Sequence, residues 1–130
     1  MTEPKSQSNV LNIALWIAQL VLAASLVWAS MLKLFQPIEK LSAMWPWVAQ
    51  VPVMLVKATG ILDLIAALGL VIPQLLGKPK LTALAAIGII MLMVCASIFH
   101  ISRGEASVIG VNIMFAVIAA VIVWGRLRKA

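Results

Sequence analysis

The sequence predicts an all-α integral membrane protein, a four-helix bundle forming one domain over residues 1–130. Hydrophobic residues make up 64% of the chain and charged residues 11%, and mean hydropathy is +1.12. Soluble domains average about 45–50% apolar and about 25% charged residues. The apolar residues are also gathered into four long runs separated by polar connections. Such a chain has too few polar side chains to cover a globular surface in water.

The four runs cover about residues 10–32, 51–72, 81–101 and 106–125. Each approaches the roughly 20 residues that cross about 30 Å of hydrocarbon as a helix. Because lipid offers no hydrogen-bond partner to a backbone amide, helix is the predicted state of each run. The first run lacks the small-residue cleavage site of a signal peptide, so we expect it to be a span. No run alternates polar and apolar residues as a barrel strand would.

The longest connection lies between the first and second runs and contains a short amphipathic segment. Its predicted apolar side carries Ile38, Leu41 and Met44–Trp45, and its polar side carries Glu39, Lys40 and Ser42. Tryptophans 45 and 47 are typical of the boundary between hydrocarbon and headgroups. We therefore expect this segment to lie at the membrane surface.

The basic residues indicate an orientation. Net charge is +6, but the basic side chains flank apolar runs and form no basic face, so nucleic acid is not an expected partner. One side of the predicted bundle carries Lys5, Lys78, Lys80 and the tail residues Arg126, Arg128 and Lys129. The other side carries Lys33, Lys40 and Arg103, with Lys57 just inside its helix. The positive-inside rule then places both termini in the cytoplasm, with the tail as the strongest anchor.

Asp63 lies near the middle of the second run, between apolar neighbours. An aspartate at the centre of a membrane helix costs about 2.5–3.5 kcal/mol on insertion scales, so it should face the bundle interior and find a partner, or become protonated. Two interpretations remain open. Asp63 either fixes helix register through an interhelical hydrogen bond or ion pair, or it recognises a ligand, a proton or a partner.

Further polar residues converge on the same end of the bundle because successive spans alternate in direction. The candidate pocket consists of Asp63, Lys33, Lys57, His100, Arg103, Glu105 and Asn112. Each has a plain alternative: the lysines can reach headgroups, His100 can cap a helix, Arg103 can pair with Glu105, and Asn112 can join helices. Lys57 lies six residues before Asp63, about 240° around the helix. Lys33 and Arg103 are therefore the better candidate partners for Asp63.

Several chemistries lack the residues that they need. One histidine and scattered carboxylates do not supply a metal site, and a haem between helices normally uses more than one axial histidine. The single cysteine, Cys95, cannot form an internal disulfide and is expected to be a small core residue. No phosphate-binding glycine loop and no catalytic triad is recognisable. We therefore expect no catalytic residues and no stand-alone enzymatic activity.

The sequence resembles the DoxX-like family of small four-span membrane proteins. The resemblance runs from about residue 12 to residue 126 and is carried by WASMLKLFQP (28–37), PWVAQVP (46–52), KATGILDLIAALGLVIP (57–73) and FHISRGEASVIGVN (99–112). Lys57, Gly60 and Asp63 look like the basic residue, glycine and acid of the family, in which arginine and glutamate are frequent; glycine is frequent where Ser30 stands. The resemblance implies a four-span bundle, and we expect it in a bacterial inner (plasma) membrane.

Functions in that family are diverse, including a subunit linked to thiosulfate:quinone oxidation, a component associated with redox stress and a receptor-assembly chaperone. The leading hypothesis is a non-catalytic accessory or binding protein that uses the outer polar pocket for a lipophile or a membrane-protein partner. One alternative is a quinone-interacting subunit of an oxidoreductase, with quinone as the possible cofactor. Another is a small transporter or proton pathway centred on Asp63, which would need a homo-oligomer.

Overall fold

The computed structural model describes residues 5–105 and 109–128, and all regular structure in these ranges is helical. The four long helices are α1 (Lys5–Phe35), α3 (Val53–Leu75), α4 (Pro79–Ser102) and α5 (Gly110–Arg128). The connection between α1 and α3 forms the short helix α2 (Ile38–Met44) and the 3-10 turn η1 (Pro46–Gln50). The predicted amphipathic segment is therefore the helix α2, and the 3-10 turn after it was not predicted.

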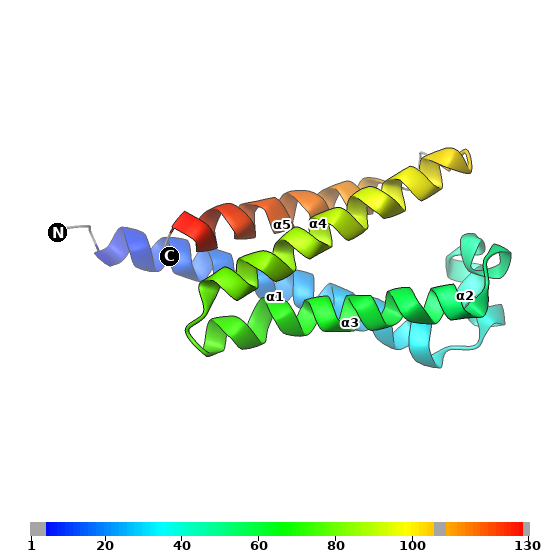
Figure 1. Cartoon of the computed structure of the whole chain (residues 1–130), viewed down its shortest axis with the longest axis horizontal. Helices are drawn as coiled ribbons and strands as arrows, with labels where there is room; N and C mark the ends of the chain where they lie inside the picture. The colour runs from blue at the N-terminus through cyan, green and yellow to red at the C-terminus, as the bar shows by residue number, and fades with distance from the viewer. Residues whose placement is uncertain (1–4, 106–108, 129–130) are drawn as a thin grey trace.

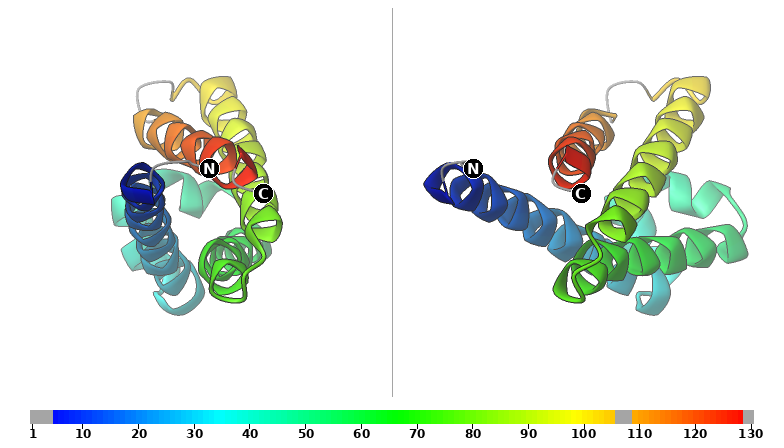
Figure 2. Two further views of the ribbon diagram at one scale, coloured as in Figure 1. Left: turned by 90° about the vertical axis from the view of Figure 1, so that its left-hand side faces the viewer. Right: turned by 60° about the vertical axis from the view of Figure 1, so that its left-hand side comes forward.

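The long helices run up and down beside one another (Figure 1). Viewed along the bundle, they form a ring in which α1 neighbours α3, α3 neighbours α4, α4 neighbours α5, and α5 returns to α1 (Figure 2). We call the end with the two termini and the 76–78 turn the terminal end. The opposite end, with α2, η1 and residues 103–105, is the loop end. The helices α1 and α3 pack closely on each other, as do α4 and α5.

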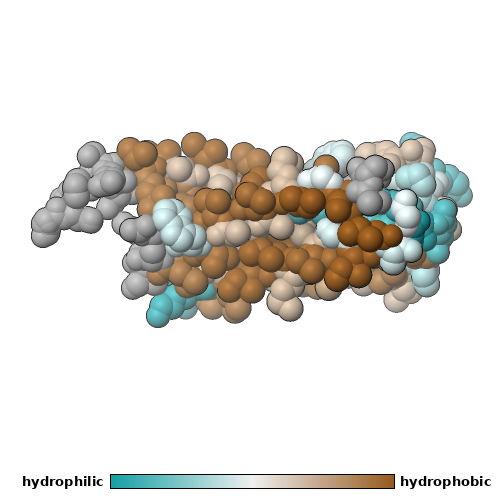
Figure 3. Space-filling view, turned by 90° about the horizontal axis from the view of Figure 1, so that it is seen from above, coloured by the Kyte–Doolittle hydropathy of each residue, from teal (hydrophilic) through white to brown (hydrophobic). Residues whose placement is uncertain are grey.

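Side chains from all four long helices form the apolar core. Its buried members are Leu22, Ala23, Leu26, Ala67, Leu70, Ala86, Ile89, Met93, Ala119 and Ile122. Many large apolar side chains point outward instead, among them Ile13, Met54, Leu84 and Val117. The face shown in Figure 3 is accordingly hydrophobic along the helices, with polar residues gathered at the loop end.

Four helices of the described chain are long and apolar enough to cross a membrane: Asn9–Phe35, Val53–Leu75, Pro79–Ser102 and Gly110–Leu127. An exposed apolar surface of this extent is unfavourable in water and favourable in lipid. The structure thus confirms the predicted all-α membrane bundle.

Several details differ from the sequence-based expectation. The helix α3 continues through Pro73 to Leu75. A proline in the last turn removes one backbone hydrogen bond but does not by itself end the helix. Residues 106–108, which the fourth predicted span included, lie outside the described residues, and α5 begins at Gly110. Cys95 is exposed on α4 and does not belong to the core. A small thiol is apolar enough to face lipid as readily as protein.

The connection α2–η1 folds back onto the ends of α1 and α3. Leu41 of α2, Val48 of η1 and Val56 of α3 form a second buried apolar cluster. Met44, expected on the buried side with Leu41, is 49% exposed. The reason is that α2 ends at Met44, so the helical periodicity that placed both on one face stops there.

Candidate functional site

The last turn of α1 and the middle of α3 meet in an ion pair at the loop-end half of the bundle. Lys33 Nζ donates to Asp63 Oδ2 over 2.9 Å, and the exposed fractions of the two side chains are 14% and 4%. The structure therefore pairs Asp63 across helices with Lys33, the first of the two partners expected from the sequence. Arg103, the second expected partner, bonds elsewhere.

Gly60 explains how the two helices come close enough for this pair. It lies three residues before Asp63, which places both on one face of α3. A Cβ at Gly60 would lie 2.9 Å from the Cβ of Lys33 and 3.3 Å from Cγ of Leu34. Because glycine has no Cβ, the side chains of Lys33 and Leu34 can lie close to α3 at this point. Gly60 thus permits the close approach, and Asp63 supplies the counterion.

Two tryptophans from the connection α2–η1 lie against the Lys33 ammonium. Nζ is 5.8 Å from the ring centroid of Trp45 and 5.9 Å from that of Trp47, within range of a cation–π attraction. Trp45 also packs edge-on against Trp28 of α1, with 6.2 Å between ring centroids. The buried cluster of Leu41, Val48 and Val56 fixes the connection over the ion pair. The two tryptophans, which the sequence suggested only as markers of the headgroup boundary, therefore also contact the Lys33 ammonium.

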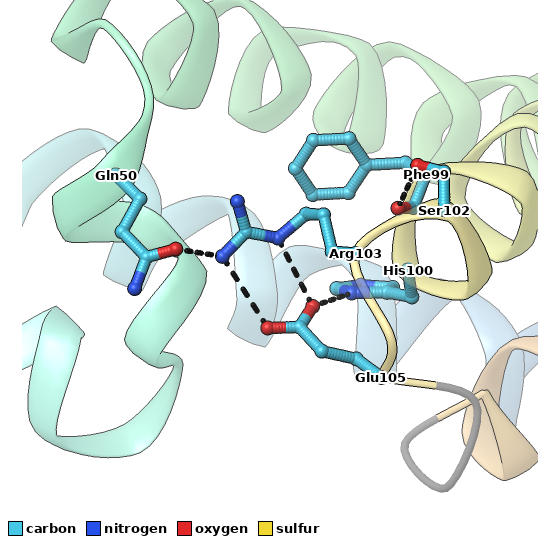
Figure 4. A network of polar contacts seen from close by, with 6 residues as sticks. All are labelled: Gln50, Phe99, His100, Ser102, Arg103 and Glu105. Carbon is cyan, nitrogen blue, oxygen red and sulfur yellow. Dashed lines mark hydrogen bonds and ion pairs between the residues drawn. The ribbon is translucent and has the colours of Figure 1, made fainter.

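A second polar group occupies the tip of α4 and the residues that follow it (Figure 4). His100 Nδ1 lies 2.9 Å from Glu105 Oε1, and Arg103 donates to both oxygens of Glu105 over 3.2 and 3.3 Å. Arg103 also donates to Oε1 of Gln50 in η1, and its guanidinium lies 5.2 Å from the Phe99 ring. Gln50 was not among the predicted site residues, because an amide after a proline-containing turn carries no distinctive sequence signal.

Trp47 touches both polar groups. Besides Lys33, its ring contacts Phe99 and His100 edge-on, with centroid distances of 5.9 and 6.2 Å. The tip of α4 is thereby connected through η1 to the ion pair between α1 and α3. Three elements distant in sequence thus place charged and aromatic side chains around one indole ring.

The remaining predicted site residues take less central positions. Lys57 is exposed and donates to the carbonyl oxygen of Leu34 over 3.0 Å, which satisfies an end carbonyl of α1. Asn112 lies half-buried near the start of α5, and no hydrogen bond joins it to the other described residues of the predicted set. The structure brings five of the seven predicted residues into the two polar groups.

The charges in these groups are matched. Lys33 neutralises Asp63, and Arg103 neutralises Glu105. Hydrogen bonds from His100 and then from Arg103 hold the pKa of Glu105 below its ordinary value of 4.5. Glu105 is therefore ionised near neutral pH. The loop end presents paired ions and aromatic faces, with no excess of either sign among these four residues.

A further polar cluster lies at the terminal end, where the sequence predicted only topology signals. Arg126 of α5 is 3% exposed, and its Nε donates to Gln19 Oε1 over 2.6 Å. Its Nη1 donates to Asn12 Oδ1 over 2.8 Å. Gln19 in turn donates to the carbonyl oxygen of Leu70 over 2.6 Å, which links α1, α3 and α5. The sequence signal for this cluster was Gln19, a glutamine inside an apolar span. Its partner Arg126 was instead grouped with the basic tail.

The loop end offers several groups that can take part in recognition. Lys33 offers an ammonium, His100 a ring nitrogen and Trp47 a flat apolar face. Within the described residues, no three histidine, cysteine, aspartate or glutamate side chains gather as a metal site would require. Such a set can orient the polar head of a molecule whose body lies in the hydrocarbon layer.

Comparisons with known proteins agree with this architecture. A model of the DoxX-like family matches residues 17–122, which include all four long helices in large part. No curated protein and no solved structure matches the chain. With the match spanning most of the sequence, the chain is a member of the DoxX-like family of integral membrane proteins.

Proposed function

We propose that this protein is a non-catalytic accessory or binding protein that holds the polar head of a lipophilic molecule at the loop end. The observation that carries the proposal is the buried ion pair of Lys33 and Asp63 beneath Trp45 and Trp47. The lipid bilayer is the source of the ligand, and a membrane-protein partner is the alternative occupant of this end.

Stability alone does not account for the pair. Replacing a buried ion pair by apolar side chains of similar volume is often neutral or stabilising, because both ions lose their hydration on burial. Packing between α1 and α3 could therefore be achieved without Lys33 and Asp63. An ammonium held beside two indole rings, by contrast, is suited to exchange its contact with Asp63 for one with a ligand oxygen.

A quinone-interacting role is the second candidate, favoured by the position of His100. The His100 Nδ1 contacts Glu105, while the ring packs against Trp47. A neutral imidazole that donates from Nδ1 presents Nε2 as an acceptor, as a quinol hydroxyl requires. Lys33, on the same indole ring, could donate to the opposite oxygen. A proton pathway through Asp63 has less support, since Lys33 already occupies that carboxylate.

Native mass spectrometry of the protein released from lipid nanodiscs tests this proposal. We expect a small lipophile to remain on the wild type and to be lost from D63N. The matched control is E39Q, which removes the exposed carboxylate of α2 at the same end. A quinone mass would select the second candidate. Bare wild-type protein, or equal retention by D63N with an unchanged melting temperature, would overturn ligand binding and favour a partner protein.

The proposed orientation places both termini in the cytoplasm of a bacterial inner membrane. Lys78 and Lys80 lie in and just after the turn at the terminal end, and α5 ends there at Arg128, whereas Arg103 and Lys40 lie at the loop end. Reporter domains inserted at Gly77 and Gly104, both in turns with φ of 75°, should report opposite sides. Gly77 is expected in the cytoplasm, and the same side for both positions would contradict a four-span protein.

A further inference from the structure

The terminal end contains a buried cation whose charge the described residues leave unbalanced. Among the described residues, Arg126 bonds only to the neutral amide oxygens of Gln19 and Asn12, and its ring contact is with Trp16, 5.9 Å from the guanidinium carbon. None of the ion pairs among the described residues includes Arg126. Its Nη2 is buried and has no hydrogen-bond partner in residues 5–105 and 109–128.

This arrangement is costly for the protein alone. Arginine stays protonated in proteins, so the guanidinium cannot escape burial by losing its proton. A buried charge without a counterion loses hydration that neutral amides replace only in part. An unpaired buried donor adds a further penalty. A bound anion would remove both penalties at once.

We infer that the seam between α1 and α5 at the terminal end is a binding site for the phosphate group of an anionic membrane lipid. Arginine donors match phosphate oxygens geometrically and bond them strongly. Nη2 of Arg126 supplies one free donor. The amide nitrogen of Asn12 supplies another, because Asn12 contacts Arg126 only through its oxygen.

The surroundings favour a lipid over a free anion as the source of this phosphate. Asn12 is exposed and Trp16 half-buried, so the α1 side of the cluster is open to whatever surrounds the bundle. Arg126 itself is buried and lies two residues before Arg128, the end of the described part of α5. On α1, Val10 and Ile13, which are close to Asn12 in the sequence, are exposed apolar residues. A phosphate with attached acyl chains therefore gains apolar contact that inorganic phosphate lacks.

The test uses the intact protein in detergent, with native mass spectrometry to count bound lipids during titration. The probes are phosphatidylglycerol, phosphatidylcholine and inorganic phosphate. We expect the first phosphatidylglycerol to bind at least about tenfold more tightly than phosphatidylcholine. The phosphate of phosphatidylglycerol has no cationic group of its own beside it, and one hydrogen bond to a charged group is strong enough to give a factor of about ten. Inorganic phosphate should not displace it. Displacement by inorganic phosphate would assign the site to a free anion, and equal affinity for the two lipids would overturn the assignment.

Variants locate the site. R126Q should lose the preference for phosphatidylglycerol, and N12A should weaken it, since each removes one donor. The matched control K80Q removes an exposed cation at the same end and should leave the preference unchanged. A loss in K80Q as large as in R126Q would mean that diffuse surface charge binds the lipid. Should R126Q fail to fold, the wild-type comparison of lipids and N12A still decide the question.

Discussion

Lys33 and Asp63, thirty residues apart in the chain, are joined by a 2.9 Å contact that links the end of α1 to the middle of α3. Trp45 and Trp47 cover the ammonium from the connecting segment. Asp63, which is costly to insert in lipid, is thus compensated within the chain, beside the two tryptophans that the proposed ligand would contact.

Removing one ion of this pair should be more harmful than removing both. D63N leaves the Lys33 ammonium without its counterion, and breaking a largely buried pair in this way costs about 3–5 kcal/mol. In the double variant K33M/D63L, two apolar side chains replace the ions, so most of this loss should be recovered. Reversible unfolding in mixed micelles measures both free energies. A double variant as unstable as D63N would contradict the interpretation that the ion pair is dispensable for stability.

Gly60 should tolerate no side chain. In G60A the added methyl group would lie 2.9 Å from the Lys33 Cβ, which forces α1 away from α3, and overpacking of this kind costs about 1–3 kcal/mol.

The matched control is G88A in α4, since a Cβ at Gly88 meets no atom within 4 Å. G88A should unfold like the wild type or be slightly more stable, because alanine favours helix over glycine. Equal effects of G60A and G88A in the same unfolding assay would show that close approach is not required at Gly60.

Glu105 should make the loop end sensitive to acid. Its folded-state pKa lies below 4.5 because His100 and Arg103 donate to the carboxylate, so the folded protein binds fewer protons than the unfolded chain. The stabilisation is fully present above the unfolded pKa, near 4.5, and is lost as pH falls through the lower folded pKa.

Melting temperatures of wild type and E105Q, measured from pH 7 down to pH 3, check this prediction. The wild type should be the more stable at pH 7, and the difference should shrink on acidification below about pH 4.5. A constant difference across this range would mean that the carboxylate charge does not contribute.

Cys95 should report the lipid-facing side of α4, because it is exposed on an apolar helix. A nitroxide spin label can be attached there. Oxygen, which concentrates in the hydrocarbon layer, should broaden the lines of its electron paramagnetic resonance spectrum more strongly than a water-soluble nickel chelate does. The control is A86C in the C95S background, since Ala86 is fully buried in the core. If the spin label reacted readily with A86C but not with Cys95, the assignment of the lipid-facing and core-facing sides of α4 would be wrong.

The amino-acid sequence by itself determined the fold class and the end at which polar residues gather. Long apolar runs must be helices in lipid, since each backbone amide has to bond within its own segment. Strict alternation of four spans then places residues 33, 63, 100, 103 and 105 toward one end, whatever the rotation of each helix. Both conclusions follow from position along the chain.

Only the tertiary structure decided which of those residues meet. Lys33, and not Arg103, contacts Asp63; η1 carries Trp47 and Gln50 into the site; and Arg126 turns inward although it resembled a tail anchor. These outcomes depend on the rotation of each helix about its own axis. In α4 and α5, apolar residues occupy every face, so no polar stripe in the sequence indicates that rotation. Packing of the four helices against one another sets it, and with it the partners of every buried polar group.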